Sequence, residues 1–337
     1  MSDEVSAPDS HACPACGAPL ASRLTVPAGE PGDPRTYSLA RCEHCGTAVT
    51  EGEPPGPESY ETGIYAPRPP RAGRAVGRLQ HVAVKQPIRL LRKAGVGPGA
   101  RVLDAGAGAG RLVAELAAAG FDSGGIEPST RGAERAAAAG QPVLRRSIEE
   151  HADAGLDAVV LWHVLEHLDD PRAALERVRS WLRPGGVLLV GVPNVASWQA
   201  RIAGPCWFHF DAPRHRVHFT PPGLEAALTR AGFEPPRLHH LVWEHNPGAM
   251  WMALLSRLGM SAGFPFHLLK RNVNARPRDL ALFALGVPLL PLALIAETAA
   301  GALGRGGTVA AITRTGANYG AGALQPSCLA SARSTES

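Results

Sequence analysis

The sequence predicts an α/β fold in which a doubly wound parallel sheet follows a small cysteine-containing module. Strands and helices alternate from residue 101 to residue 231, and two Cys-x-x-Cys pairs lie within the first 45 residues. Short apolar strands that alternate with helices are typical of parallel sheets covered by helices on both faces. The chain has 337 residues, 45% hydrophobic and 19% charged, so it can bury such a core, and a wholly disordered chain is excluded.

Residues 1–50 predict a zinc ribbon. The pairs Cys13/Cys16 and Cys42/Cys45 are each followed by Gly, which relieves the backbone of a tight knuckle turn. Four thiolates suit tetrahedral Zn²⁺ in a closed structural site. The start of the chain is acidic and lacks the apolar core of a signal peptide, so we expect a cytoplasmic, reducing compartment, in which such cysteines bind metal. Residues 1–60 hold nine acids and three Arg, which argues against nucleic acid as a partner.

Residues 51–75 are rich in Pro, Gly and charge, and predict a linker. Residues 76–95 predict one or two helices, interrupted near Pro87. The stretch from Arg68 to Lys93 contains eight basic residues and no acid. It is either a solvated linker and helix face, or a contact with an anionic surface such as phosphates or lipid headgroups.

Residues 76–245 are expected to form the core. Its strands are expected at 101–103, 123–126, 142–145, 156–161 and 186–192, and its helices at 111–119, 130–139, 171–182 and 221–231. Two final strands, at 238–243 and 308–314, are separated by an insertion at 246–305. The last core strand lies within 306–316, and residues 317–337 predict a disordered tail.

The insertion contains an unusually apolar stretch. Leu280–Ala296 has no charge over 17 residues and includes Pro288 and Pro291. It is short for a membrane-spanning helix, and the prolines weaken it further. We interpret it as a broken hairpin lying in a membrane interface, with a buried core insertion or a dimer interface as the alternatives. Four basic residues precede it: Lys270, Arg271, Arg276 and Arg278.

A glycine-rich turn follows the first core strand. Asp104 precedes Gly106-x-Gly108-x-Gly110, and Glu127 ends the second strand. Such a turn lets a ligand approach the backbone closely, and a carboxylate after the second strand can accept hydrogen bonds from ribose hydroxyls. The spacing differs from that of the dinucleotide-binding fingerprint.

This turn resembles motif I of the class I S-adenosylmethionine-dependent methyltransferases. Residues 156–171 and 182–194 resemble the fourth-strand motif of that family and its turn and fifth strand. The pattern is most similar to ubiquinone-biosynthesis-type methyltransferases, many of which act on small molecules. The resemblance implies a Rossmann-like, seven-stranded methyltransferase sheet and S-adenosylmethionine as cofactor.

The resemblance also implies roles for individual residues. The loop from Asp104 to Gly110 would hold the methionine part of the cofactor, and Glu127 would hold its ribose. Ser147 and Ile148 would contact adenine, and Trp162 would help to floor the methyl-donor pocket. The cofactor-binding candidates are therefore Asp104, Gly106, Gly108, Gly110, Glu127, Ser147, Ile148 and Trp162.

Two clusters of histidines and acids supply catalytic candidates. If a helical turn starts at His163, it shares a face with Glu166 and His167. The pattern resembles the Glu-x-x-Glu-His motif with which some ubiquinone-pathway and small-RNA 2′-O-methyltransferases hold a divalent ion, except that His163 replaces the first Glu. A second divalent metal, a His general base without metal, and a structural or substrate-binding role all stay open. The catalytic candidates are His163, Glu166, His167, His215 and His218; His209 and Asp211 lie in the same later segment.

The expected function is methyl transfer to a small-molecule acceptor, by O-methylation of a sugar, a quinone-like compound or a lipid-linked substrate. The alternatives are C-methylation of a nucleotide-activated sugar, RNA methylation through the ribbon and the 68–93 stretch, and a non-catalytic scaffold. We expect a cytoplasmic protein that associates peripherally with the inner membrane face.

Overall fold

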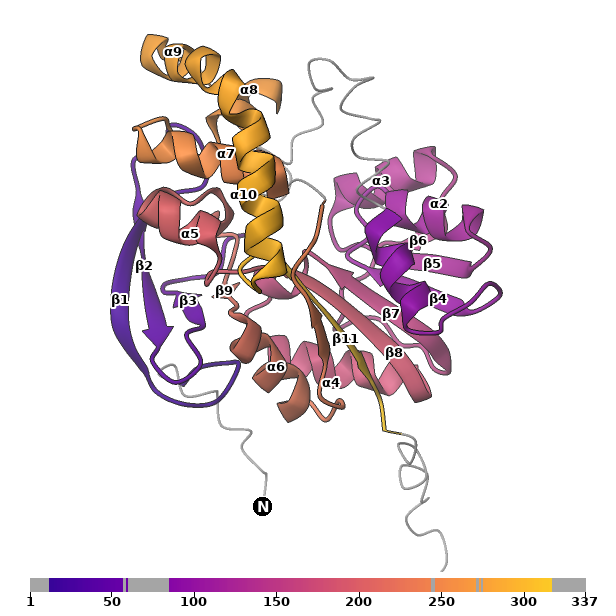
Figure 1. Ribbon diagram of the computed structural model, residues 1–337. Helices are drawn as coiled ribbons and strands as arrows, with labels where there is room; N and C mark the ends of the chain where they lie inside the picture. The colour runs from indigo at the N-terminus through magenta and orange to yellow at the C-terminus, as the bar shows by residue number, and fades with distance from the viewer. Residues whose placement is uncertain are drawn as a thin grey trace, which may run out of the picture.

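The computed structural model describes residues 12–56, 59, 85–243, 246–270, 273 and 275–316. Most of the expected linker, the first part of the 76–95 segment and the expected tail lie outside these residues. Two sheets organise the described chain, one of four strands and one of seven (Figure 1).

The seven-stranded sheet lies at the centre of the molecule in the order β6-β5-β4-β7-β8-β11-β10 (Figure 1). The strands from β6 to β8 are parallel, whereas β11 is antiparallel to both β8 and β10. This confirms the predicted doubly wound sheet. After β10, the insertion brings the chain back to the sheet at the end where β10 stops. β11 therefore runs in the direction opposite to β10. The strands are β4 (Arg101–Ala105), β5 (Asp122–Ile126), β6 (Val143–Leu144), β7 (Leu156–Trp162), β8 (Leu182–Pro193), β10 (Arg237–His239) and β11 (Thr308–Arg314).

Helices cover both faces of this sheet, as a doubly wound fold requires. On one face, Leu175 and Leu224 pack in a core with Trp181 of the same layer. On the other face, Leu91 from a helix at 85–93 packs with Leu116. The helices that cover the sheet include α2 (Arg111–Ala118), α3 (Thr130–Ala138), α4 (Pro171–Trp181) and α6 (Pro221–Arg230).

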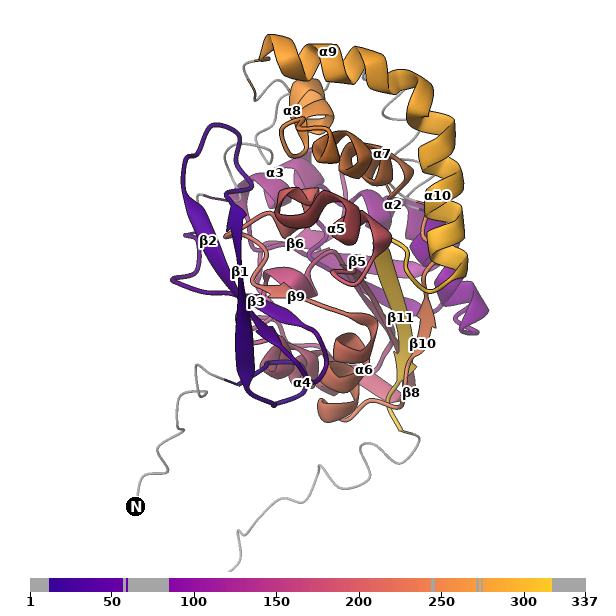
Figure 2. The same cartoon turned by 60° about the vertical axis from the view of Figure 1, so that its left-hand side comes forward.

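The cysteine module is a small antiparallel sheet of β1 (Leu20–Pro27), β2 (Thr36–Cys42), β3 (Ala48–Thr50) and β9 (Val217–His218). The fourth strand comes from the methyltransferase-like core, because Ala48 pairs with His218 and Val49 with Val217. The ribbon therefore shares a sheet with a later segment of the chain, and Figure 2 shows it standing along one side of the molecule.

Between β8 and β9 the chain forms α5 (Trp198–Ala203), η4 (Gly204–Cys206) and η5 (Phe208–Phe210). The described part of the insertion contains the helices α7 (Asn246–Arg257), α8 (Phe264–Lys270), α9 (Pro277–Gly286) and α10 (Leu290–Ala302), with a 3₁₀ turn η6 (Val287–Leu289) between the last two. By length and composition, the stretch Pro277–Ala302 could cross a membrane; its mean hydropathy is 2.1, and 17% of its most apolar window is buried.

Candidate active site

The glycine turn between β4 and α2 forms the floor of a cleft with a volume of about 700 Å³. Gly106 and Gly108 line the cleft and have φ angles of +88° and +52°, in the left-handed region that favours glycine. A Cβ on Gly106 would lie 2.3 Å from the Val164 side chain. Any other residue at position 106 would therefore be strained both by the positive φ and by a clash with Val164.

Glu127 follows β5 and faces this turn. Its carboxylate accepts hydrogen bonds from the backbone N–H of Gly108 at 2.8 Å and of Ser129 at 2.9 Å. These bonds fix the carboxylate against the glycine turn, where the predicted ribose contact would be made. Asp104 is buried beneath it, and burial, together with the nearby Glu127 charge, raises the pKa of Asp104 to about 7.

The predicted adenine contacts, Ser147 and Ile148, line the same cleft. Trp162 is not among the lining residues; instead its ring packs over Gly191, where a Cβ would lie 2.6 Å from the indole. Several other lining residues could not be predicted, because isolated arginines and prolines carry no motif. They include Arg131, Arg135, Arg145 and Arg146, together with Pro54 and Pro55 from the start of the expected linker.

The first catalytic cluster meets the cleft at the end of β7. His163 lines the cleft with a left-handed φ of +56°, which is uncommon for a residue other than glycine. Its Nδ1 lies 3.1 Å from Glu166 Oε1. Because a carboxylate can only accept, Nδ1 is the nitrogen that donates to Glu166; in a neutral ring this arrangement leaves the lone pair on Nε2. The expected helical turn is a 3₁₀ helix, η3 (Leu165–His167).

Glu166 is buried, with 1% of its surface exposed. Its second oxygen, Oε2, has no hydrogen-bond donor among the described residues. A buried carboxylate oxygen without a partner is costly, so this atom is a candidate ligand for a cation or a substrate proton.

His167 and His215 lie together behind His163. Their rings are 4.6 Å apart, and one ligand atom from each, with one from Glu166, lie within 4.8 Å of one another. The Nδ1 of His167 donates to the Arg214 carbonyl at 3.1 Å, and the Nδ1 of His215 donates to the His209 carbonyl at 2.8 Å. Both rings therefore keep the Nε2 lone pair, as metal-binding histidines do.

Burial, followed by the charges of the neighbouring His167 and His218, holds the pKa of His215 well below its usual range. Burial, with Arg216 nearby, lowers the pKa of His218 to about 3. Both rings are neutral at physiological pH. His218 donates through Nε2 to Thr50 Oγ1 at 2.9 Å, and Thr50 in turn donates to the His215 carbonyl at 2.7 Å. Thr50 of the ribbon thus contacts the backbone of His215 and the side chain of His218, a link that the sequence did not indicate.

The four ribbon cysteines form a second cluster. Cys13 Sγ lies 3.6 Å from Cys45 Sγ, and Cys16 Sγ lies 3.5 Å from Cys42 Sγ. These separations are close to the roughly 3.8 Å expected between thiolates around a tetrahedral zinc ion with Zn–S bonds of about 2.3 Å, and far from the roughly 2.05 Å of a disulfide. The sulfur atoms are therefore arranged as a four-thiolate metal site would require.

Comparisons with known proteins agree with this geometry. A family model described as a methyltransferase domain matches residues 78–237. A ubiquinone biosynthesis O-methyltransferase of Azorhizobium caulinodans is 34% identical over 160 residues, which cover 43% of this chain and 63% of that one. A protein of the same name from Erwinia tasmaniensis is 31% identical over 164 residues, covering 44% and 67%. The chain belongs to the S-adenosylmethionine-dependent methyltransferases.

A solved S-adenosylmethionine-dependent methyltransferase from Thermotoga maritima, described as a possible histamine N-methyltransferase, is also similar. It is 19% identical with a TM-score of 0.46, and the match covers 73% of this methyltransferase and 94% of that chain. The Azorhizobium match spans less than two thirds of the relative, and the ribbon and the insertion lie outside the matched family region. The substrate of this methyltransferase therefore has to be argued from its own residues.

Proposed function

We propose that this methyltransferase transfers the methyl group of S-adenosylmethionine to a hydroxyl oxygen of a small-molecule acceptor. The observation that carries the proposal is the His163–Glu166 pair at the wall of the cofactor cleft, with the lone pair of His163 on Nε2. Methyl transfer from a sulfonium is an in-line displacement, for which the cofactor already supplies the leaving group. A hydroxyl acceptor additionally has to lose its proton, and a positioned imidazole is the usual base for that step.

The cofactor would lie along the glycine turn. Gly106 and Gly108 would admit its methionine part, Glu127 would accept hydrogen bonds from the ribose, and Ser147 and Ile148 would contact the adenine. Asp104 would support the turn from below, and Gly110 would begin α2. His163 Nε2 would accept the acceptor's proton, while Glu166 would hold the ring and balance its new charge.

Among the described residues, two clusters have donor atoms that would suit a metal ion. The four cysteines would hold a structural Zn²⁺. Glu166, His167 and His215 would hold a second divalent ion, and the orphaned Glu166 Oε2 supports this fit. When bound, the second ion would supply a Lewis acid that lowers the pKa of an acceptor hydroxyl. Two imidazoles and one carboxylate suit Zn²⁺ or Fe²⁺ better than Mg²⁺. His218, which is bonded to Thr50, would position this group.

The proposed acceptor is a sugar, a quinone-like compound or a lipid-linked substrate. The ubiquinone biosynthesis O-methyltransferases among the relatives support O-methylation. We place the enzyme in the cytoplasm, and at the inner membrane face when the acceptor is lipid-linked. Labelled S-adenosylmethionine, incubated with a lysate separated into lipid, sugar and RNA fractions, identifies the class. Label in the RNA fraction alone would contradict the proposal, and label on acceptor carbon would favour C-methylation.

His163→Ala is expected to lower turnover by about 100-fold or more, because the base is lost, and to leave cofactor affinity within about twofold. His215→Ala should have the same pattern. Turnover is followed by label transfer, and affinity is measured by calorimetry. His239→Ala, on the distant edge strand β10, is the matched control and should keep full turnover.

Unchanged turnover in both site variants would exclude this cluster from catalysis. The metal is tested separately, by elemental analysis of the purified protein and by chelation. If chelation removes all metal except the ribbon zinc and activity remains full, the reaction needs no second metal. His163 would then act as a base without one.

A further inference from the structure

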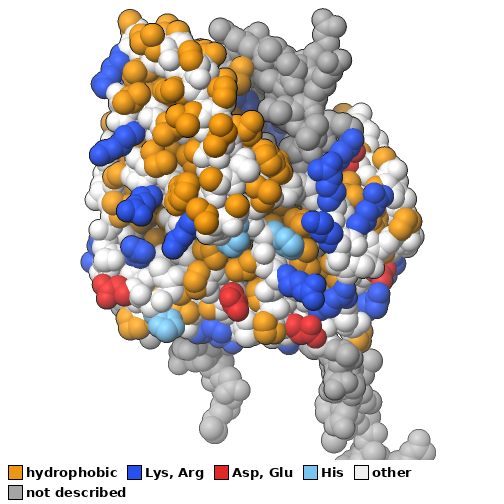
Figure 3. Space-filling model, in the orientation of Figure 1, with side chains coloured by type: hydrophobic (Ala, Val, Ile, Leu, Met, Phe, Trp, Pro, Cys, Tyr) orange, Lys and Arg blue, Asp and Glu red, His pale blue; other side chains and the backbone are white. Residues whose placement is uncertain are grey.

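The outer surface of the insertion is unusually apolar. Large side chains of α9, η6 and α10 are exposed to solvent, among them Leu285 at 75%, Ile295 at 66% and Leu292 at 54%. The exposed set that defines this apolar surface is Leu280, Leu285, Val287, Leu290, Leu292, Leu294, Ile295 and Leu303. The helices of the insertion, α7–α10, form a lobe, and Figure 3 shows hydrophobic side chains gathered over it. So large a group of exposed apolar side chains indicates an interaction surface.

The packing of α10 is the reverse of that in an ordinary surface helix. Its buried residues are Ala293, Glu297, Ala300 and Gly301, whereas its leucines and isoleucine point outward. A helix of a water-soluble core buries its large apolar residues. Small residues at the helix contact and large ones outside are typical of helices whose outer face meets lipid.

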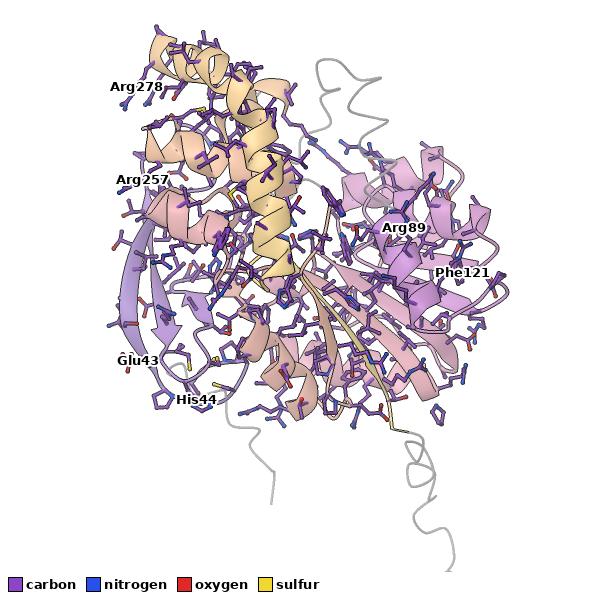
Figure 4. The ribbon with its side chains drawn as sticks, viewed as in Figure 1. Glu43, His44, Arg89, Phe121, Arg257 and Arg278 are labelled. Atoms are coloured by element: carbon purple, nitrogen blue, oxygen red, sulfur yellow. The ribbon has the colours of Figure 1, made fainter. Side chains whose placement is uncertain are left out.

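The charges of the lobe have one sign at its surface. Within the described part of residues 246–303, both acids are buried: Asp279 accepts hydrogen bonds from Ser261, and Glu297 accepts from Gly307 and Gln199. The exposed charges are basic, and Figure 4 shows two of them, Arg257 and Arg278, at the outer edge of the lobe. Two such surfaces facing each other would bring like charges together, which disfavours self-association.

The shape of the helices favours a peripheral arrangement. Figure 2 shows α9 running across the top of the molecule and α10 descending at its side, with the corner at η6. The last turns of α10 are tied to the core through Glu297, whose carboxylate accepts from Gln199 Nε2 and Gly307 N–H, both at 2.8 Å. A helix that is bent and anchored in this way can enter an interface with its exposed face but cannot cross a bilayer as a straight rod.

We propose that the apolar surface of α9–α10 docks onto an anionic lipid membrane, with its leucines and isoleucine below the headgroups and Arg257, Arg276 and Arg278 among them. Apolar burial would supply the affinity, and the arginines would select anionic over neutral lipid. The docking surface and the preference for anionic lipid go beyond the proposed function. They rest on that function only for the identity of the methyl acceptor. Membrane binding is measured without turnover, so the two can fail separately.

The test is flotation of the full chain with vesicles of phosphatidylcholine alone or mixed with phosphatidylglycerol. We expect binding to the mixed vesicles that weakens as salt is added. The combined variant Leu285→Ser, Leu292→Ser, Ile295→Ser should lower this binding at least about tenfold, because three exposed apolar side chains lose their lipid contact. Arg276→Gln with Arg278→Gln should lower binding to the mixed vesicles by about tenfold and leave neutral vesicles unaffected.

Matched controls distinguish binding through this surface from nonspecific adsorption to vesicles. Leu24→Ser with Leu144→Ser removes exposed leucines elsewhere, and Arg177→Gln removes an exposed arginine of α4; both should bind like the unaltered chain. Failure of the unaltered chain to float with mixed vesicles would overturn the proposal. The proposal would also be overturned if the Ser variant bound vesicles normally but had a lower oligomer mass in light scattering, because the surface would then join two copies. Resistance to alkaline extraction would also overturn it, because the helix would then span the bilayer.

Discussion

At the scale of single residues, Gly106 links the backbone of the glycine turn to the segment that carries the proposed base. Its φ of +88° and the Val164 side chain, 2.3 Å from where a Cβ would stand, leave no room for a side chain. Val164 is the residue directly after His163, so a shift there would also move the proposed base. The same glycine therefore shapes the glycine turn and constrains the position of the proposed catalytic cluster.

Gly106→Ala is expected to weaken cofactor binding at least about tenfold and to destabilise the fold by about 1–3 kcal/mol, from a strained φ plus a steric clash. Gly140→Ala is the matched control, because Gly140 also has a positive φ of +67° but no atom within 4 Å of its would-be Cβ. Calorimetry and denaturant unfolding measure the two effects. Equal losses in both variants would show that backbone strain alone, and not the Val164 contact, is responsible.

Asp104 predicts a pH dependence of stability. Its pKa of about 7 in the folded chain exceeds the value of about 3.9 for an unfolded Asp, so the folded state binds its proton more tightly. The free energy of unfolding should therefore decrease as pH rises from about 4 to about 7, by up to about 1.4 kcal/mol per pH unit from this group.

Asp104→Asn should remove this part of the slope, measured by denaturant unfolding of the cofactor-free protein across that range. Glu297, whose pKa burial raises to about 7, contributes a second and independent part. Glu297→Gln should therefore remove its own share and leave that of Asp104. An unchanged slope in Asp104→Asn would mean that Asp104 is already ionised near pH 4.

At the scale of elements, the ribbon contacts the segment that carries the proposed catalytic histidines. β3 pairs with β9, Thr50 bonds to His218 and to the His215 carbonyl, and the Gly29 N–H donates to the Ala212 carbonyl. The Thr220 hydroxyl donates to the Cys45 carbonyl, next to a metal-binding candidate. These contacts make the four-Cys site a support for the histidine segment.

Thr50→Val is expected to cost about 1–3 kcal/mol of stability, because the buried His218 Nε2–H and His215 carbonyl lose their partner. Turnover should fall while cofactor affinity stays unchanged, since Thr50 lies outside the cofactor cleft. Thr47→Val is the matched control: Thr47 is equally buried on the ribbon, but its hydroxyl has no hydrogen bond among the described residues, so the change should stay within about 0.5 kcal/mol. A parallel loss of cofactor affinity in Thr50→Val would indicate general unfolding rather than a local role.

At the scale of the whole molecule, the sequence predicted what depends on local pattern. Alternating strands and helices, the glycine turn and the Cys-x-x-Cys knuckles are short-range signals, and the structure bears out the doubly wound sheet of seven strands. The pairing of Val217–His218 with the ribbon could not be predicted, because a two-residue strand has no periodicity and its partner is distant in sequence. Trp162 was placed toward the cofactor from family likeness, yet packing on Gly191 decides its position.

The pairing of β3 with β9 also sets an order of assembly during synthesis. The four cysteines leave the ribosome before β9 does, and β3 keeps an unpaired edge until Val217 and His218 have been made. Contacts between segments so far apart form late, since the intervening chain has to be ordered first. The histidine segment would then be fixed only when the newly made core closes onto the ribbon.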